Sequence, residues 1–568
     1  MIWGTMTMTV PWKKRRPLNL RKKVAFFLLP LPLLAATEMR PDCRVDGVCD
    51  VAFPKVPGAT VETRRLDGGF AWRLRFSDAA ARIVTNEVWR FDFGADLRCW
   101  PVARAQSAYA PKRLSSIGGD RRMKPSRHGA YANWYPGSAE GPLVVEGPGW
   151  VAALGDAGVI DYARLRFTGG GRTGCVATRL EGAAHVPSTR FTPWRYIHVA
   201  KDCVALANAQ RRFLDALNEP SRLADTSWIR PGKVMRVARL TTQDGFATVD
   251  FAARNGLQYV EVDAGWYGPE QTGDPLKPSV DPRRAVKGAA FDLQAIIDRA
   301  RSKGLGVILY VNWRPLLKAR DAILDRLVAM GASGVKYGFV DVGSQMNRIQ
   351  VVAAIEAAAK RRLVVDIHDE FRLTGIQRTF PHVLTVEGIC GNEEMPSAAH
   401  NAALPFTRYL DGPGDYTFCW GERRVKNTLA HQLALPLLYD SGLQFLYWYQ
   451  TPAMVDERNP ALAFWRELPV AFDETRWLQG RIGECAVVAR RRGDTWFLAG
   501  INAGKMRTFR VPLDFAGKGR LTVRLFRDAE AANTRFDAPV RTETQERTAS
   551  ESLEVTAAAN GGFAAIIE

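Results

Sequence analysis

The stretch FDLQAIIDRARSKGLGVILYVNWRPLLKARDAILDRLVAMGASGVKYGFV, residues 291–340, decides the fold class of this chain. In it, segments with the apolar spacing of a helix alternate with short apolar runs of the kind that form buried strands. The helix-like segments are 291–303, 319–330 and, further on, 348–360, and the strand-like runs are 307–311, 335–340 and 363–367. Repeated units of this length predict a parallel sheet with right-handed crossovers, and eight of them close a (β/α)8 barrel.

The regions on either side of this pattern have the alternation of β-strands. Residues 45–220 show short alternating runs interrupted by Gly, Pro and Asp, which is typical of a β-sandwich. After residue 477 the alternation returns, with a hairpin signal at 492–494. The predicted parts are a leader at 1–36, an N-terminal β-sandwich at 40–222, a barrel at 223–476 and a C-terminal β-sandwich at 477–568.

The chain of 568 residues, 46% of them hydrophobic, is large enough for several buried cores, and its formal net charge is +19. No nucleic-acid-binding motif accompanies this charge, so we expect no nucleic-acid partner. Seven of these positive charges lie in the basic leader, between Lys13 and Lys23, and precede an apolar run, Val24 to Ala36, that ends in small residues. This layout is that of a secretory signal, and the run is too short for a membrane span of about 20 residues. We therefore expect a secreted, periplasmic protein without stable membrane insertion.

The eight cysteines match no zinc motif. In an oxidising compartment Cys43 and Cys49 are close enough in sequence to close a short loop, and this pairing stays open. Cys390 and Cys419 are expected to be buried as small apolar side chains.

Polar residues follow the strand-like runs of the predicted barrel, at the carboxyl ends where barrel enzymes have their active sites. They are Asp263, Asn312, Asp341, His368, Asp369, Glu370, Glu387 and Glu393, with Trp266 and Trp313 close by and Lys336 inside the fourth run. A glycosidase needs one carboxylic acid to protonate the leaving oxygen, a second carboxylate as base or nucleophile, and aromatic faces for sugar rings. Any single acid here could be a solvated loop residue or a helix N-cap, but polar endings on five successive strands favour a glycosidase.

The motif HDEFRLTGIQRTFPHVLTVEGICGNE at 368–393, together with DAGWY at 263–267, LPFTR at 404–408 and GPGDYT at 412–417, resembles glycoside hydrolase family 97. The resemblance covers nearly the whole chain after the leader. It implies an N-terminal β-supersandwich, a catalytic (β/α)8 TIM barrel and a C-terminal β-sandwich. It also implies a calcium-dependent α-glucosidase or α-galactosidase that acts on oligosaccharides. The oligomeric state stays open.

The resemblance also implies roles for individual residues. Glu393 stands at the position of the general acid, Glu387 resembles a calcium ligand, and His368 and Lys336 resemble substrate contacts. In the first domain, Asp156 matches a position where the family has a Glu that reaches calcium, although a role in a β-turn is the alternative. The expected calcium ligands are therefore Asp156, Asp369, Glu387 and Glu393. The expected substrate contacts are Asp263, Trp266, Asn312, Trp313, Lys336 and His368.

The second carboxylate distinguishes two mechanisms in the family. Retaining members have an Asp nucleophile in a K-x-D-F run, which here reads KYGF and places Gly338 at that position. Inverting members have a Glu base after the His of the fifth strand, where this chain has Asp369, and a further Glu after the third strand, where it has Asn312. The expected enzyme is an inverting exo-α-glucosidase with Asp369 as base. An α-galactosidase of the same family and a catalytically degenerate sugar-binding protein are the alternatives.

Overall fold

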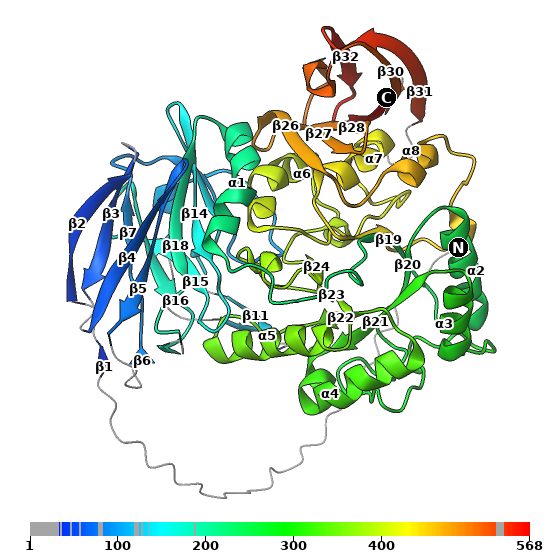
Figure 1. The fold of residues 1–568 in the computed structure, drawn as a ribbon, viewed down its shortest axis with the longest axis horizontal. Coiled ribbons are helices and arrows are strands. Elements are labelled where there is room, and N and C mark those ends of the chain that lie inside the picture. The colour runs from blue at the N-terminus through cyan, green and yellow to red at the C-terminus, as the bar shows by residue number, and fades with distance from the viewer. Residues whose placement is uncertain are drawn as a thin grey trace, which may run out of the picture.

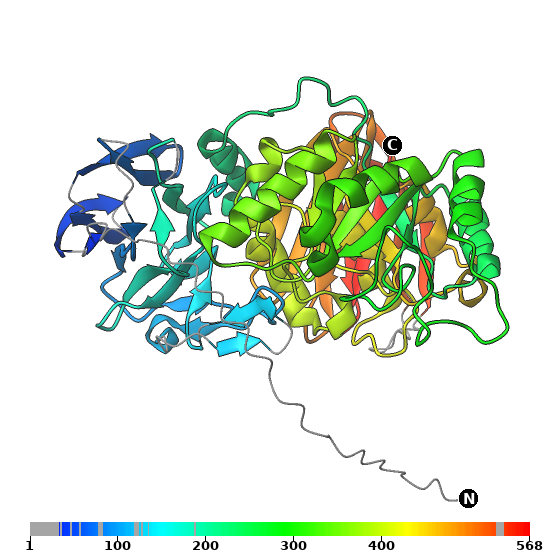
Figure 2. The same ribbon diagram turned by 90° about the horizontal axis from the view of Figure 1, so that it is seen from below.

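The computed structural model describes residues 33–34, 37–45, 48–55, 58–77, 83–118, 124–126, 129–134, 136–186, 189–529 and 539–568. Most of the predicted leader lies outside these residues. Two views place the N-terminal sheets at one end of the molecule, beside a central barrel, and Figure 1 shows the C-terminal sheets packed on another side of that barrel (Figure 1; Figure 2). The predicted three-part architecture is confirmed.

The N-terminal part contains two large sheets that pack face to face. The first has the order β12 (Ala139–Glu140), β15 (Leu165–Gly169), β16 (Cys175–Leu180), β7 (Arg90–Asp92), β3 (Cys49–Lys55), β2 (Thr37–Val45). The second has the order β4 (Ala59–Leu66), β5 (Gly69–Phe76), β18 (Trp194–Ala200), β14 (Trp150–Ala157), β13 (Leu143–Gly147), β8 (Arg98–Trp100), β9 (Lys112–Arg113). Small additional sheets are formed by β1 (Leu33–Leu34), β6 (Ile83–Val84) and β17 (Ala184–His185), and by β10 (Lys124–Ser126) and β11 (Gly129–Trp134). Fully buried Trp72 and Trp89 lie 5.6 Å apart between the large sheets, and such aromatic burial stabilises a sandwich.

Helix α1 (Cys203–Leu217) joins this sandwich to the rest of the molecule. Its first turn is capped by Asp202, whose side chain accepts a hydrogen bond from the Ala205 N–H. Its buried face, including Leu206 and Phe213, belongs to one hydrophobic cluster that continues into the barrel and the C-terminal sheets. The three parts therefore share a core.

The central parallel sheet has the order β24 (Val383–Val386), β23 (Val364–Ile367), β22 (Gly334–Gly338), β21 (Gly306–Asn312), β20 (Tyr259–Val262), β19 (Gly232–Arg236), β25 (Leu443–Tyr447). Helices α2 (Thr242–Arg254), α3 (Leu293–Ser302), α4 (Trp313–Met330) and α5 (Gln345–Ala359) lie outside it (Figure 1). The strands are buried on both faces, which explains their continuous apolar runs.

Seven strands, and not the predicted eight, form the barrel within residues 189–529, all of which the structure describes. Residues 415–419 close the gap between β24 and β25 without forming a strand. The Asp415 N–H donates to the Val386 carbonyl at 3.0 Å, and the Phe418 N–H donates to the Phe445 carbonyl at 2.9 Å. This segment follows Gly412, which has φ +124°, and Pro413, which has no N–H to donate, so a regular strand does not begin there.

The C-terminal part contains a sheet in the order β26 (Glu474–Arg481), β27 (Cys485–Arg492), β28 (Thr495–Asn502), β33 (Gly562–Ile567), β30 (Arg520–Asp528), β31 (Val540–Thr548). The pair β29 (Arg507–Pro512) and β32 (Ser552–Ala557) covers its core. Helices α6 (Ala398–Ala403), α7 (Leu429–Leu438) and α8 (Ala461–Glu467) lie between this sheet and the barrel (Figure 1). The predicted hairpin at 492–494 joins β27 to β28.

The predicted loop between Cys43 and Cys49 involves a side chain, that of Cys43, outside the described part of the chain. Cys390 and Cys419 are free and buried, as expected. Across the described residues, we find no helix with both the length and the apolar character needed to cross a membrane.

Candidate active site

The buried imidazole of His368 lies at the centre of the candidate site, directly after β23. Its Nε2 lies 2.8 Å from Asp415 Oδ2, and its Nδ1 lies 3.3 Å from Glu387 Oε2. Burial and the Lys336 ammonium lower the pKa of His368, but Glu387 and Asp366 outweigh them, so that this pKa is well above its ordinary value. The neighbouring carboxylates therefore favour the protonated form of the imidazole.

Asp369 adopts a left-handed backbone conformation with φ +72°, which Asp tolerates better than most residues. Its N–H donates to Glu387 Oε2 at 2.7 Å, and its own Oδ2 accepts from the Phe339 N–H at 2.5 Å. Burial, reinforced by the Glu393 charge, raises the pKa of Asp369 to about 6. The turn therefore directs this carboxylate towards the end of β22.

Glu387 and Glu393 follow β24. Glu387 Oε2 also accepts from the Gln106 side-chain amide at 3.0 Å, and Glu393 Oε1 accepts from the Trp448 indole N–H at 2.5 Å. Burial raises the pKa of Glu387 well above its ordinary value, and although the His368 charge opposes this, neighbouring carboxylates add to it. The structure thus brings the predicted acid, Glu393, into one cluster with Glu387 and His368, whose ligand-type atoms lie within 4.8 Å of one another.

Lys336 and Asp263 form the other part of the candidate site. The Lys336 ammonium lies 4.0 Å from the centroid of the Trp448 ring, and Asp263 Oδ2 lies 3.0 Å from Arg236 Nε. Burial raises the pKa of Asp263, but the Lys336 and Arg236 charges outweigh it and hold this pKa well below its usual range. Asp263 and Arg236 also line an open cavity of about 300 Å³.

The two tryptophans predicted to contact sugar are buried. The Trp266 indole N–H donates to the Tyr310 carbonyl at 2.8 Å, and its ring is 1% exposed. Trp313 is also 1% exposed and packs edge-on against Tyr337, whose hydroxyl donates to the Ala354 carbonyl of α5. Trp313 therefore belongs to the layer between the sheet and its helices.

Asn312 ends β21 and is fully buried. Its side-chain oxygen accepts from the Arg314 N–H at 3.0 Å and caps α4. Its side-chain amide lies 3.4 Å from the Tyr310 hydroxyl. Its predicted contact with substrate stays a prediction.

Sequence reasoning missed Trp448. This residue directly follows β25 and touches Glu393 and Lys336, and the Arg236 guanidinium lies 4.6 Å from its ring centroid. The rule that picked out the other strand-end residues applies to it equally. The chain between β24 and β25 has no regular strand pattern, so the sequence provided no count of strands that would lead to Trp448.

Asp156 is not gathered with the other predicted calcium ligands. Among the described residues, the groups of three or more side chains able to hold a metal are Asp366 with His368 and Asp415, and His368 with Glu387 and Glu393. Asp156 is paired in register with Arg195 of β18, and its Oδ2 lies 3.5 Å from the Arg195 guanidinium. From the N-terminal part it is Gln106, which sequence reasoning missed, that reaches Glu387.

The remaining three carboxylates provide a test of whether calcium fits. Glu387 has its pKa raised by Asp369 and Glu393, and Asp369 has its pKa raised by Glu393. This mutual repulsion is what a bound cation would relieve, and carboxylate oxygens are the ligands that calcium prefers. Glu387 and Glu393 therefore fit calcium and belong to one group with His368, whereas Asp369 is in neither of the groups found among the described residues. Ligation by Asp369 and calcium binding itself stay predictions.

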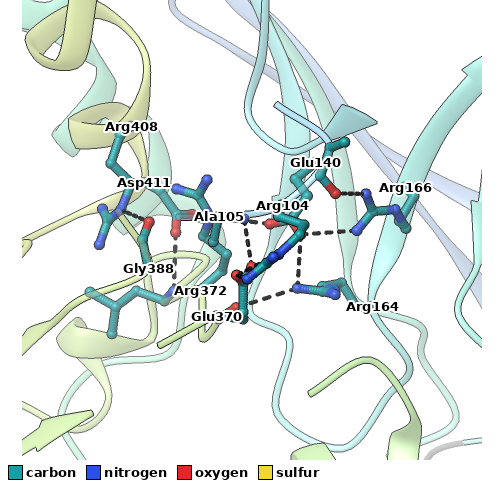
Figure 3. A network of polar contacts seen from close by, with 12 residues as sticks. Arg104, Ala105, Glu140, Arg164, Arg166, Glu370, Arg372, Gly388, Arg408 and Asp411 are labelled. Carbon is teal, nitrogen blue, oxygen red and sulfur yellow. Dashed lines mark hydrogen bonds and ion pairs between the residues drawn. The ribbon is translucent and has the colours of Figure 1, made fainter. Parts of the chain in front are cut away.

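A network of buried charges holds the chain after Asp369 against the N-terminal part (Figure 3). Glu370 Oε2 accepts from the Ala105 N–H at 2.6 Å, and Glu370 Oε1 accepts from the Arg104 guanidinium at 3.0 Å. Arg372 extends towards Glu140, 3.4 Å away, which also pairs with Arg166. Because residues 104–106 contact both Glu370 and Glu387, the N-terminal part positions the segments on either side of the candidate site.

Position 338, where retaining members of the resembled family have their nucleophile, is closed to a side chain. A Cβ added to Gly338 would lie 2.1 Å from the Tyr310 hydroxyl. The structure therefore leaves no room for a carboxylate at this position without moving Tyr310.

A parallel barrel with carboxylates, a His, a Lys and a Trp gathered at the carboxyl ends of its strands has the groups that a glycoside hydrolase needs. Three family descriptions match the chain: "Glycosyl-hydrolase 97 N-terminal" at residues 48–220, "Glycoside hydrolase 97" at 232–389 and "Glycosyl-hydrolase 97 C-terminal, oligomerisation" at 471–568. The chain belongs to glycoside hydrolase family 97.

Two curated relatives carry the word galactosidase in their names. A probable retaining alpha-galactosidase of Streptomyces bingchenggensis is 37% identical over 390 residues, which cover 66% of this chain and 58% of that protein. A retaining alpha-galactosidase of Bacteroides thetaiotaomicron is 31% identical over 414 residues, which cover 67% of this chain and 60% of that protein. The matched region spans about three fifths of the length of these relatives.

Solved structures share the fold at lower identity. A glycoside hydrolase family 97 enzyme from Pseudoalteromonas sp. strain K8, in complex with acarbose, is 22% identical, with a TM-score of 0.78 and coverage of 92% of this chain and 87% of that one. A beta-arabinopyranosidase is 18% identical, with a TM-score of 0.69 and coverage of 91% and 85%. These likenesses concern the fold.

Proposed function

We propose that this protein is an exo-acting α-glycosidase that removes terminal α-linked sugars from oligosaccharides. The observation that carries the proposal is the placement of Glu393 beside Trp448 and His368, at the mouth of the barrel. The curated relatives favour α-galactosides as substrates. α-Glucosides are the second candidate, since Gly338 and Asp369 follow the inverting layout that the sequence shares with the α-glucosidases of the family.

In the proposed reaction Glu393 protonates the oxygen of the leaving sugar. The Trp448 N–H holds one oxygen of Glu393 and so orients the carboxyl group. Because Gly338 cannot form a covalent bond to the sugar, water attacks the anomeric carbon and Asp369 helps to orient it. The product therefore has inverted configuration. His368, Lys336 and Asp263 offer charged hydrogen-bonding groups for the hydroxyls of the sugar.

Calcium, held by Asp369, Glu387 and Glu393, would neutralise the repulsion between these carboxylates and polarise bound sugar oxygens. We also propose export to the periplasm, on the basis of the basic and apolar pattern of the first 36 residues.

A comparison of aryl α-galactosides with aryl α-glucosides tests the function. We expect release of the aryl group from at least one of the two, with β-sugar as the first product in proton NMR spectra taken before mutarotation. Release of α-sugar first would contradict inversion. Saturable sugar binding without release of any aryl group would instead identify a degenerate sugar-binding protein.

A further inference from the structure

The carboxylate of Glu270 also lies at the mouth of the barrel, and it has no part in the reaction described so far. It belongs to the loop that follows β20, and its side chain is 22% exposed. The Tyr310 hydroxyl donates a hydrogen bond to Glu270 Oε1. On its other side, Glu270 Oε2 lies 3.9 Å from the Arg284 guanidinium. The carboxylate is therefore fixed in place but remains partly open to solvent.

Tyr310, which is hydrogen-bonded to Glu270, links this carboxylate to the interior of the barrel. It is paired in register with Lys336 of β22. Its hydroxyl occupies the space where residue 338 would have a side chain, 2.1 Å from an added Cβ. The next residue, Phe339, donates its N–H to Asp369. The pair Tyr310–Glu270 and the carboxylate of Asp369 thus approach residues 338 and 339 from two sides.

The strand order places Glu270 across the barrel from the acid. Glu393 follows β24 and is bonded to Trp448, which follows β25. These two strands are the ends of the sheet, and residues 415–419 join them. Tyr310 lies on β21, the middle strand of the seven. A sugar bound between them would have Glu393 on one face and Glu270 on the other, as inversion by two carboxylates requires.

We propose that Glu270, and not Asp369 as the sequence predicts, is the carboxylate that takes the proton from the attacking water; this inference rests on the proposed function. Asp369, whose Oδ2 already accepts from the Phe339 N–H, helps to hold the water. The oxygen of water bonds to the anomeric carbon, the bond from that carbon to the leaving oxygen breaks, and Glu393 gives its proton to the leaving oxygen. The other proton, from water, passes to Glu270. The step leaves Glu393 ionised and Glu270 protonated, and exchange with solvent restores both.

The charges around Glu270 suit this role. Burial raises the pKa of Glu270, and the Asp263 carboxylate adds to this, whereas the Tyr310 hydrogen bond, the Arg284 charge and the Asn312 amide lower it. Arg283 and the Tyr267 hydroxyl are the other titratable groups that interact with it. A base with a raised pKa accepts a proton more readily than an ordinary carboxylate.

Glu270→Gln tests the proposal because it keeps the size of the side chain and removes the proton acceptor. On substrates with good and with poor leaving groups alike, we expect kcat to fall by about 100-fold or more with KM changed less than threefold. The fall in kcat/KM at low pH should also disappear. In Tyr310→Phe the loss of its hydrogen bond raises the pKa of Glu270, so the fall at low pH should begin at a higher pH.

The matched control is Gln271→Ala, which alters the next residue of the same loop and removes a hydrogen bond to Arg314. It should keep kcat and the pH profile of the wild type. Thermal melting and binding of galactose check that each variant is folded. If Glu270→Gln keeps more than a tenth of kcat while the wild type hydrolyses aryl α-glycosides, the inference is overturned and the proposed function stands. If the wild type hydrolyses none of them, both are overturned.

Discussion

Single glycines shape the loop that presents the candidate acid. A Cβ at Gly388 would lie 2.2 Å from the Phe371 carbonyl oxygen, and a Cβ at Gly391 would lie 2.6 Å from the Tyr416 carbonyl oxygen. Both positions therefore need glycine, which explains the spacing of the motif from Glu387 to Glu393. The close approach brings the turn at Asn392–Glu394 under Trp448, so that Glu393 meets the indole N–H.

Glu393→Gln should separate acid catalysis from binding. We expect kcat/KM to fall by about 10³-fold on substrates with poor leaving groups, and far less on aryl glycosides whose leaving group needs no proton. The control is Glu394→Gln, one residue further on and exposed, which should retain activity. Equal losses on both kinds of substrate would assign Glu393 a structural or metal-binding role instead.

At the scale of elements, the contact between β21 and β22 leaves no space for a side chain at residue 338. Tyr310 and Gly338 are complementary, since the ring of one fills the space left by the other. Tyr310 and Lys336 are paired in register on neighbouring strands and point to the same side, into the barrel, and Gly338, two positions after Lys336, lies on that side too. Tyr337 points to the helices. The Tyr310 side chain therefore fills the space that a side chain at residue 338 would need.

Gly338→Ala should destabilise the protein by about 1–3 kcal/mol because it overpacks this contact. In a Tyr310→Ala background, Gly338→Ala should lower the free energy of unfolding much less. A double-mutant cycle by chemical denaturation measures this coupling between residues 310 and 338. Gly118→Ala is the control, since an added Cβ there meets nothing within 4 Å. Equal costs of Gly338→Ala in both backgrounds would show that Tyr310 is not what excludes the side chain.

At the scale of the whole molecule, the N-terminal sandwich completes the site. Residues 104–106 bind both Glu370 and Glu387, and the buried pair of Arg372 with Glu140, in the network of Figure 3, attaches this part to the barrel. Buried ion pairs cost desolvation, but removing one partner leaves an uncompensated charge. The sandwich and the barrel are therefore expected to act as one unit in presenting Asp369 and Glu387.

Chelation should lower the melting temperature by a few degrees and reduce activity, and added calcium should restore both, because a ligand bound to the folded state stabilises it by mass action. Glu387→Gln should abolish the calcium-dependent shift in melting temperature. Asp156→Asn should leave the shift intact, because Asp156 faces Arg195 and not the three carboxylates. An unchanged melting temperature after exhaustive chelation, with no metal found by elemental analysis, would contradict the calcium prediction.

Local pattern was sufficient for the three-part architecture, although not for the number of strands in the barrel. Apolar runs at 307–311, 335–340 and 363–367 became β21, β22 and β23, because a strand buried on both faces must be apolar throughout. The strand-end rule found His368, Asp369, Glu387 and Glu393, since the carboxyl ends of parallel strands meet at one edge. It also selected Trp313, although that ring packs towards the helices, because the rule does not specify to which side a residue turns.

The sequence by itself determined the order of the three parts, the barrel and the cluster around His368, because each depends on periodicity or on residues near one another in the chain. Tertiary structure alone decided the partners: Gln106 with Glu387 across 281 residues, Trp448 with Glu393 across 55, and Glu270 with Tyr310 across 40. It also turned Asp156 towards Arg195. Such pairings depend on how loops and domains pack in space, and no local period records that packing.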